Sequence, residues 1–171
     1  MQNILTLRNT GVLNYKTARA VLAQTLILAA ALVLPSVCHY FKLSVSAFVP
    51  MHWPILFAGL IYGRKSGLML GIAAPVISFL ISGMPAGAML PIMILELATY
   101  GFIAGFAKEK LNLNSLFAVI CALFCGKLVY IGAALMINNS FSLAFVKNAA
   151  FIIILQIILL PFLADAWISK K

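Results

Sequence analysis

Residues 88–107 read AMLPIMILELATYGFIAGFA, a run of twenty residues in which Glu96 is the one charged side chain. As an α-helix that rises about 1.5 Å per residue, this run spans the ~30 Å hydrocarbon core of a bilayer. Glu96 then lies near the middle of the membrane, where an unpaired charge costs several kcal/mol. The stretch therefore predicts a membrane-spanning helix and a cation that pairs with Glu96.

Lys127 is the cation that we expect to form this pair. The polar stretch 108–114 links the run to a second apolar segment, and in an antiparallel hairpin, residues equally distant from its midpoint, Leu111, share a depth. Glu96 and Lys127 are nearly equidistant from Leu111. The same rule applied to the next turn, 138–142, brings Lys127 within one helical turn of Gln156. Three consecutive helices are thus predicted to bring one strongly polar side chain each to similar depth.

The composition of the whole chain predicts a polytopic membrane protein. Of its 171 residues, 64% are hydrophobic and 9% are charged, and the mean hydropathy is +1.12. Values of this size exclude a water-soluble domain, and about six spans of ~20 residues with short loops fill the length. We expect an all-α six-transmembrane-helix bundle that forms one integral membrane domain over residues 1–171. Its spans are expected at about residues 17–37, 51–62, 66–82, 88–107, 115–137 and 146–168.

The basic residues indicate orientation rather than nucleic-acid binding. The formal net charge is +9, but the Lys and Arg residues stand singly or in twos at the ends of spans. Nine of them lie on the face that holds both termini, and two, Lys42 and Lys147, lie on the other. The positive-inside rule then puts both termini in the cytoplasm. In this arrangement Pro35 ends the first span, and residues 38–50 form the longest outer loop.

Glycines four residues apart predict close contacts between helices, because they let two backbones approach each other. Three such pairs lie near one expected membrane face: Gly59 with Gly63, Gly67 with Gly71, and Gly101 with Gly105. We therefore expect tight helix packing near that face.

The sequence has no pattern typical of an enzyme. An intramembrane hydrolase needs paired acids or clusters of His and acid, whereas Glu96 is the only acid expected in mid-span and both histidines are expected at the outer face. Residues 59–66 (GLIYGRKS) imitate a phosphate loop, but Arg64 replaces its second glycine. The three cysteines are interpreted as packing residues. We expect no catalytic residue, metal or cofactor in this chain, so ATP-driven transport would need ATPase partner subunits.

The block 51–105 resembles a known family of transport proteins. It contains MHWPILFAGLIYG followed by basic residues, a glycine-rich third span, and then SGMP and ELATYGF. These motifs and the six-span plan resemble the substrate-binding S components of energy-coupling factor (ECF) vitamin transporters. The resemblance implies a small high-affinity binder whose pocket lies near the outer face, built mainly from spans four to six and covered by outer loops. It also implies a transmembrane T component and two ATPase subunits as partners, in a bacterial cytoplasmic (inner) membrane.

Carried onto this sequence, the resemblance gives eight candidate substrate-binding residues. These polar or aromatic residues are His52, Trp53, Glu96, Lys127, Tyr130, Asn138, Asn139 and Gln156. Tyr100, one turn from Glu96, is expected to support the carboxylate rather than to touch the ligand. Two interpretations of the charge pair stay open: Glu96 and Lys127 contact the substrate, or they clamp two helices without touching it. A metal substrate is disfavoured, because Gln2 follows Met1 where nickel and cobalt members of this class use Met-His.

The expected function is therefore high-affinity binding of a vitamin or vitamin-like micronutrient for an ECF-type ABC importer. Two other classes stay open. A stand-alone small carrier or channel would also hold a charge pair in mid-membrane, although the two halves of the chain show no internal repeat. A structural membrane protein would account for the glycine pairs but not for the polar side chains at similar depth.

Overall fold

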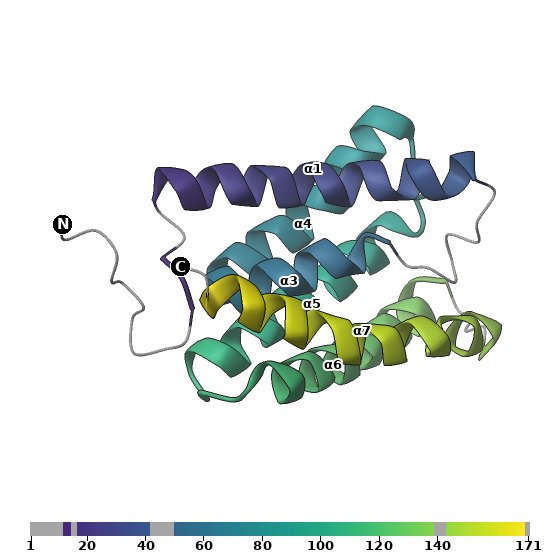
Figure 1. Ribbon diagram of the computed structural model, residues 1–171. Helices are drawn as coiled ribbons and strands as arrows, with labels where there is room; N and C mark the ends of the chain where they lie inside the picture. The colour runs from purple at the N-terminus through teal and green to yellow at the C-terminus, as the bar shows by residue number, and fades with distance from the viewer. Residues whose placement is uncertain (1–11, 15–16, 42–49, 139–142, 170–171) are drawn as a thin grey trace.

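The computed structural model of the protein describes residues 12–14, 17–41, 50–138 and 143–169. Within these ranges the chain is helical and contains no strand (Figure 1). The helices are α1 (Ala18–Tyr40), α3 (His52–Tyr62), α4 (Arg64–Ser82), α5 (Leu90–Glu109), α6 (Ser115–Asn138) and α7 (Leu143–Ser169).

Five of these helices are long and apolar enough to cross a membrane, and this finding confirms the prediction of an all-helical membrane protein. The sixth, α3, has only 11 residues. At 1.5 Å per residue it covers about 16 Å, roughly half of the hydrocarbon core. Nine of its residues are buried, since α1, α4, α5, α6 and α7 all pack against it. This surrounding protein lets a short helix lie within the bundle.

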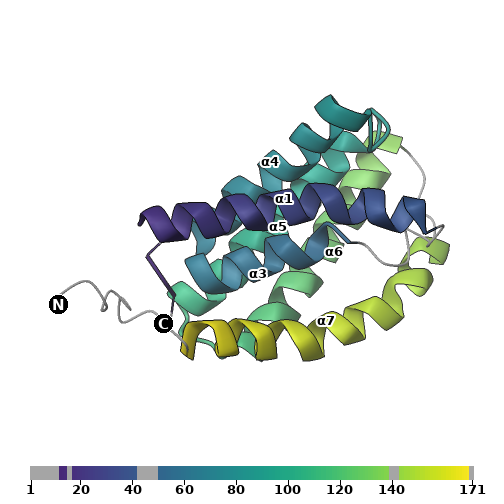
Figure 2. The ribbon, with the colours of Figure 1, turned by 45° about the horizontal axis from the view of Figure 1, so that its top comes forward.

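The helix α5 is central in the bundle, where it packs against α3, α4 and α6. Two helices lie outside this group: α1 rests on α3 and α4, and α7 rests on α3 and α6. Figures 1 and 2 show α1 and α7 on opposite sides of α3. The run of sequence from which the fold was predicted therefore forms the helix that organises the bundle.

The predicted tight packing at the glycine pairs is observed, mainly as backbone contacts between α4 and α5. A Cβ atom added to Gly67 would lie 2.2 Å from the carbonyl oxygen of Gly101, and one added to Gly71 would lie 2.5 Å from that of Leu97. A Cβ atom on Gly105 would lie 2.2 Å from the amide nitrogen of Arg64. Real Cβ atoms do not approach backbone this closely. The two helices can therefore pack in this register only with glycine at these positions.

A methyl group at Gly67 is expected to destabilise the bundle. Gly67→Ala must push α4 away from α5, and overpacking of this kind costs typically 1–3 kcal/mol. Gly132→Ala on α6 is the matched control, since an added Cβ meets nothing within 4 Å there. Thermal unfolding in detergent should show a lower midpoint for Gly67→Ala than for Gly132→Ala. Equal midpoints would contradict the backbone contact.

The candidate membrane span in α1 runs from Ala18 to Pro35, so the first span ends at Pro35 as predicted, although the helix itself does not. The helix α1 continues through Pro35 to Tyr40, so Cys38 belongs to the helix rather than to a loop. Proline removes one backbone donor, and a membrane helix tolerates this loss where neighbouring groups satisfy the freed carbonyl. The expected loop is shorter as a result, and its residues 42–49 lie outside the described ranges.

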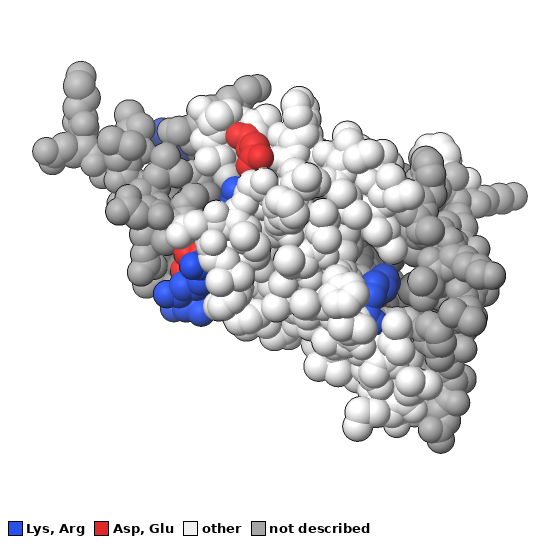
Figure 3. Space-filling model, turned by 90° about the horizontal axis from the view of Figure 1, so that it is seen from below, with Lys and Arg blue, Asp and Glu red and all other residues white. Residues whose placement is uncertain are grey.

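Charged side chains gather mainly at one end of the bundle, and most of the surface seen in Figure 3 is uncharged. At that end Arg64 Nε lies 3.8 Å from a Glu109 oxygen, and Lys108 Nζ lies 3.6 Å from Asp165. The Ser115 hydroxyl also donates a hydrogen bond to Asp165. These contacts connect the first residue of α4 to the end of α5, and connect the end of α5 and the start of α6 to α7.

Candidate functional site

The carboxylate of Glu96 is the centre of a buried polar cluster. Glu96 is 1% exposed, and its Oε1 accepts hydrogen bonds from Lys127 Nζ at 2.6 Å and from the Tyr100 hydroxyl at 2.9 Å. Nε2 of His52 lies 3.4 Å from the same oxygen. We call Glu96, Lys127, Tyr100 and His52 the Glu96 cluster. The predicted pairing of Glu96 with Lys127 is confirmed, and the Tyr100 hydroxyl contacts the carboxylate as expected.

Three helices position this cluster. Glu96 and Tyr100 stand four residues apart on α5, a spacing that puts both side chains on one face of a helix. Lys127 comes from α6 and His52 is the first residue of α3. Gly126 makes room for the ring of Tyr100, since a Cβ there would lie 2.3 Å from its Cε1. Sequence reasoning missed Gly126, although a glycine directly before the one mid-span lysine was a usable signal.

The position of His52 differs from the expected one. Both histidines were predicted to lie at the outer face, yet His52 is 3% exposed and contacts the mid-span carboxylate. The reason is that α3 is short and begins inside the bundle, so its first residue reaches the depth of Glu96. The side chain of His39 lies outside the described part of the chain.

Aromatic rings surround the ammonium group of Lys127. Its Nζ lies 5.1 Å from the ring centroid of Tyr130 and 5.9 Å from that of Tyr100. The ring of His52 meets Tyr100 edge to face at 4.9 Å. Cation–π contacts of this kind contribute about 0.5–2 kcal/mol and, with the carboxylate, offset the cost of burying the charge. The side chain of Lys127 is 15% exposed, so its ammonium is the most accessible part of the charge pair.

Two buried side chains near these helices have nitrogen atoms that lack hydrogen bonds. Among the described residues, Nδ1 of His52 and Nε2 of Gln156 have no hydrogen-bond partner, and Nε2 of His52 has only its 3.4 Å contact with Glu96. Gln156 is 1% exposed and lies in a buried stripe of α7 with Ile152, Leu160 and Ala164. A buried polar group without a partner costs about 1–3 kcal/mol, so such groups are rare in native proteins and often mark functional sites.

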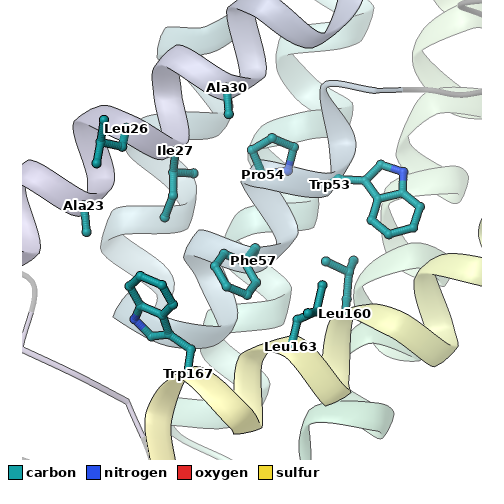
Figure 4. Close-up of a pocket in the computed structure, with 10 residues that line it drawn as sticks. All are labelled: Ala23, Leu26, Ile27, Ala30, Trp53, Pro54, Phe57, Leu160, Leu163 and Trp167. Carbon is teal, nitrogen blue, oxygen red and sulfur yellow. The ribbon is translucent and has the colours of Figure 1, made fainter. Parts of the chain in front are cut away.

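The remaining predicted residues are distributed differently. Tyr130 is buried beside Lys127. Trp53, next to His52 in sequence, instead lines an apolar groove between α1, α3 and α7 (Figure 4). Asn138 is the last residue of α6, and its side chain lies outside the described residues, as does all of Asn139. The structure thus brings together His52, Glu96, Lys127 and Tyr130, and places Trp53 on another surface.

A metal-binding arrangement is absent from the described ranges, where no group of three His, Cys, Asp or Glu side chains could hold an ion.

Comparison with known proteins identifies the family of this chain. A family model described as "ECF transporter, substrate-specific component" matches residues 20–169, a range that includes the whole Glu96 cluster. No curated protein and no solved structure matches the chain significantly.

Proposed function

Because this chain belongs to the substrate-specific (S) components of ECF transporters, we propose that it captures a vitamin or vitamin-like micronutrient for import. S components are membrane-embedded transport subunits and not enzymes; they bind small molecules and work with T and ATPase subunits. We propose that this chain works with a transmembrane T component and two ATPase subunits. The ATP is then bound and hydrolysed by those partners, and this chain supplies only the substrate site.

The proposed substrate site includes the Glu96 cluster, Tyr130 and Gln156. The observation that carries this assignment is that two buried nitrogen atoms, Nδ1 of His52 and Nε2 of Gln156, have no hydrogen-bond partner in the described part of the chain. A bound molecule with polar ring or amide atoms would give these nitrogens partners and remove their cost. Asn138 and Asn139 remain proposed contacts nearer the mouth of the site, whereas Trp53 lines the apolar groove between α1, α3 and α7.

The charges of the site favour a substrate with little net charge. Glu96 and Lys127 offset each other at 2.6 Å, so a fully ionised ligand would face no unpaired countercharge. The ring of Tyr130 provides a flat surface for stacking. A polar aromatic heterocycle that is uncharged or zwitterionic fits this combination, and many vitamins and their precursors have this chemistry.

We also propose that the charged end of the bundle faces the cytoplasm of a bacterial cell, with both termini on that side. Arg64, Lys65, Lys108 and Lys110 lie at this end, as the positive-inside rule requires. A cysteine at Lys65, which is exposed, tests the orientation in a variant without the native cysteines. An impermeant thiol reagent should label it only after the cells are permeabilised, and labelling of intact cells would reverse the orientation.

Ligand capture by the isolated protein tests the proposed function. The protein is purified without ATP and without partner subunits, exposed to a mixture of vitamins and their precursors, and analysed by native mass spectrometry. We expect one small organic molecule to bind with 1:1 stoichiometry and to raise the thermal unfolding midpoint, since a ligand that binds only the folded state stabilises it. Failure of every compound to bind would favour a structural role.

A further inference from the structure

An apolar groove lies on the side of the bundle formed by α1 and α7, and its lining contains no residue of the Glu96 cluster. It has a volume of about 350 Å³ and is lined by four residues of α1, three of α3 and three of α7 (Figure 4). The groove exists because no Cα atom of α1 comes within 8 Å of one in α7 among the described residues, so α3 forms its floor. Two of the α1 positions are alanines, Ala23 and Ala30, which leave this space open.

The surroundings of the groove indicate hydrocarbon as its occupant. Its lining is carbon apart from two indole nitrogens, and both walls belong to helices that are candidate membrane spans. Within the lining, the rings of Phe57 on α3 and Trp167 on α7 meet edge to face, with their centroids 6.2 Å apart. Ala23 and Ala30 are separated by about 10 Å along α1, which fits within one leaflet of a ~30 Å core. A single lipid tail from one leaflet therefore matches the length of the groove.

A cation marks one end of this groove. Arg19 precedes Ala23 by one helical turn and therefore lies on the same face of α1, about 6 Å beyond the groove. Arg19 is exposed, and no described residue forms a hydrogen bond or ion pair with it. A guanidinium group at the edge of the hydrocarbon region is well placed to bind a phosphate.

We propose that the groove binds an anionic phospholipid, with one acyl chain between α1 and α7 and the headgroup phosphate at Arg19. The acyl chain would contact Ala23 and Ala30 on one wall and Leu163 on the other. The ligand fills the gap beside α1, which among the described helices packs on α3 and α4 alone. This site is separate from the proposed substrate site, so either proposal can fail without the other.

Native mass spectrometry with phosphatidylglycerol and phosphatidylcholine of equal chain length tests the site. Wild-type protein should retain one phosphatidylglycerol more tightly than phosphatidylcholine. The double variant Ala23→Leu/Ala30→Leu fills the groove and should weaken retention of both lipids by about tenfold or more. Ala29→Leu is its matched control, because Ala29 is exposed and does not line the groove, and it should bind as the wild type does.

Charge recognition is tested separately with Arg19→Gln. This variant should keep the acyl-chain site but lose about fivefold in its preference for phosphatidylglycerol, whereas Lys65→Gln, remote from the groove, should keep that preference. Thermal unfolding midpoints, measured for every variant, identify any that is misfolded.

The proposal is overturned if the groove-filled variant Ala23→Leu/Ala30→Leu binds lipid as tightly as the wild type, or if Arg19→Gln keeps the wild-type preference for phosphatidylglycerol. A photo-crosslinking residue at position 30 that captures a membrane protein in cells, instead of phospholipid, would show that a partner helix occupies the groove.

Discussion

Glu96→Gln and Lys127→Met, made singly, should each lower the free energy of unfolding by roughly 3–5 kcal/mol. Each change leaves the other charge buried without its partner, at a site where Glu96 is almost fully excluded from solvent. A change of protonation by the remaining group would reduce the loss. The measurement is equilibrium or thermal unfolding in one detergent, with expression level as an independent readout.

The double variant Glu96→Gln/Lys127→Met should recover most of this loss, because neither charge remains to be compensated. The expected coupling energy is well above the few tenths of a kcal/mol found for independent sites. Glu96→Gln combined with Lys65→Met is the matched control, since Lys65 is exposed and lies in the first turn of α4, at the charged end. Strictly additive losses in the Glu96–Lys127 cycle would show that the 2.6 Å contact does not contribute to stability.

Ligand binding by the stable double variant separates the two interpretations of the charge pair. If the pair only clamps α5 to α6, the double variant binds the substrate with unchanged affinity. If the pair belongs to the substrate site, the double variant is stable but binds weakly. The proposed function predicts the second result, because Lys127 is the exposed end of the pair and lies between two tyrosine rings.

The charge pair could be predicted from the sequence because few charged residues were available to form it. Only one acid and one lysine were expected at mid-span, and the short polar linker between their helices fixed the register of the hairpin. Tyr100 followed from its spacing to Glu96 on the same helix, and the α4–α5 contact followed from glycines four residues apart. These inferences depend on local periodicity or on a short connection, both of which can be derived from one sequence.

The position of His52 could not be predicted in this way. Its depth depends on where the short helix α3 lies among five other helices, and that is set by packing between residues remote in sequence. The groove beside Trp53 has the same origin, since it reflects a separation between α1 and α7, which are far apart in the chain. Pro35 shows a further limit: the candidate span ends there as predicted, but the helix continues to Tyr40, because a membrane protein can accommodate proline within a helix.

Gln156→Leu should leave stability unchanged or raise it, while it weakens substrate binding by about tenfold or more. The carboxamide is buried and its Nε2 has no hydrogen-bond partner among the described residues, so removing it removes a cost of about 1–3 kcal/mol from the free protein. A substrate that accepts a hydrogen bond from this nitrogen would lose that bond and bury an unpaired acceptor. Stability and affinity are therefore expected to change in opposite directions.

Gln24→Leu is the matched control for this prediction, because the side chain of Gln24 is already satisfied. Its Oε1 accepts a hydrogen bond from the Ser66 hydroxyl at 2.6 Å, and its Nε2 donates to the carbonyl of Ala20. Gln24→Leu leaves the buried Ser66 hydroxyl without this acceptor, so it should lower stability by about 1–3 kcal/mol and leave substrate affinity unchanged. Both variants are compared by thermal unfolding and by calorimetric titration with the compound found by native mass spectrometry. Unaltered affinity in Gln156→Leu would remove α7 from the substrate site and restrict the site to α3, α5 and α6.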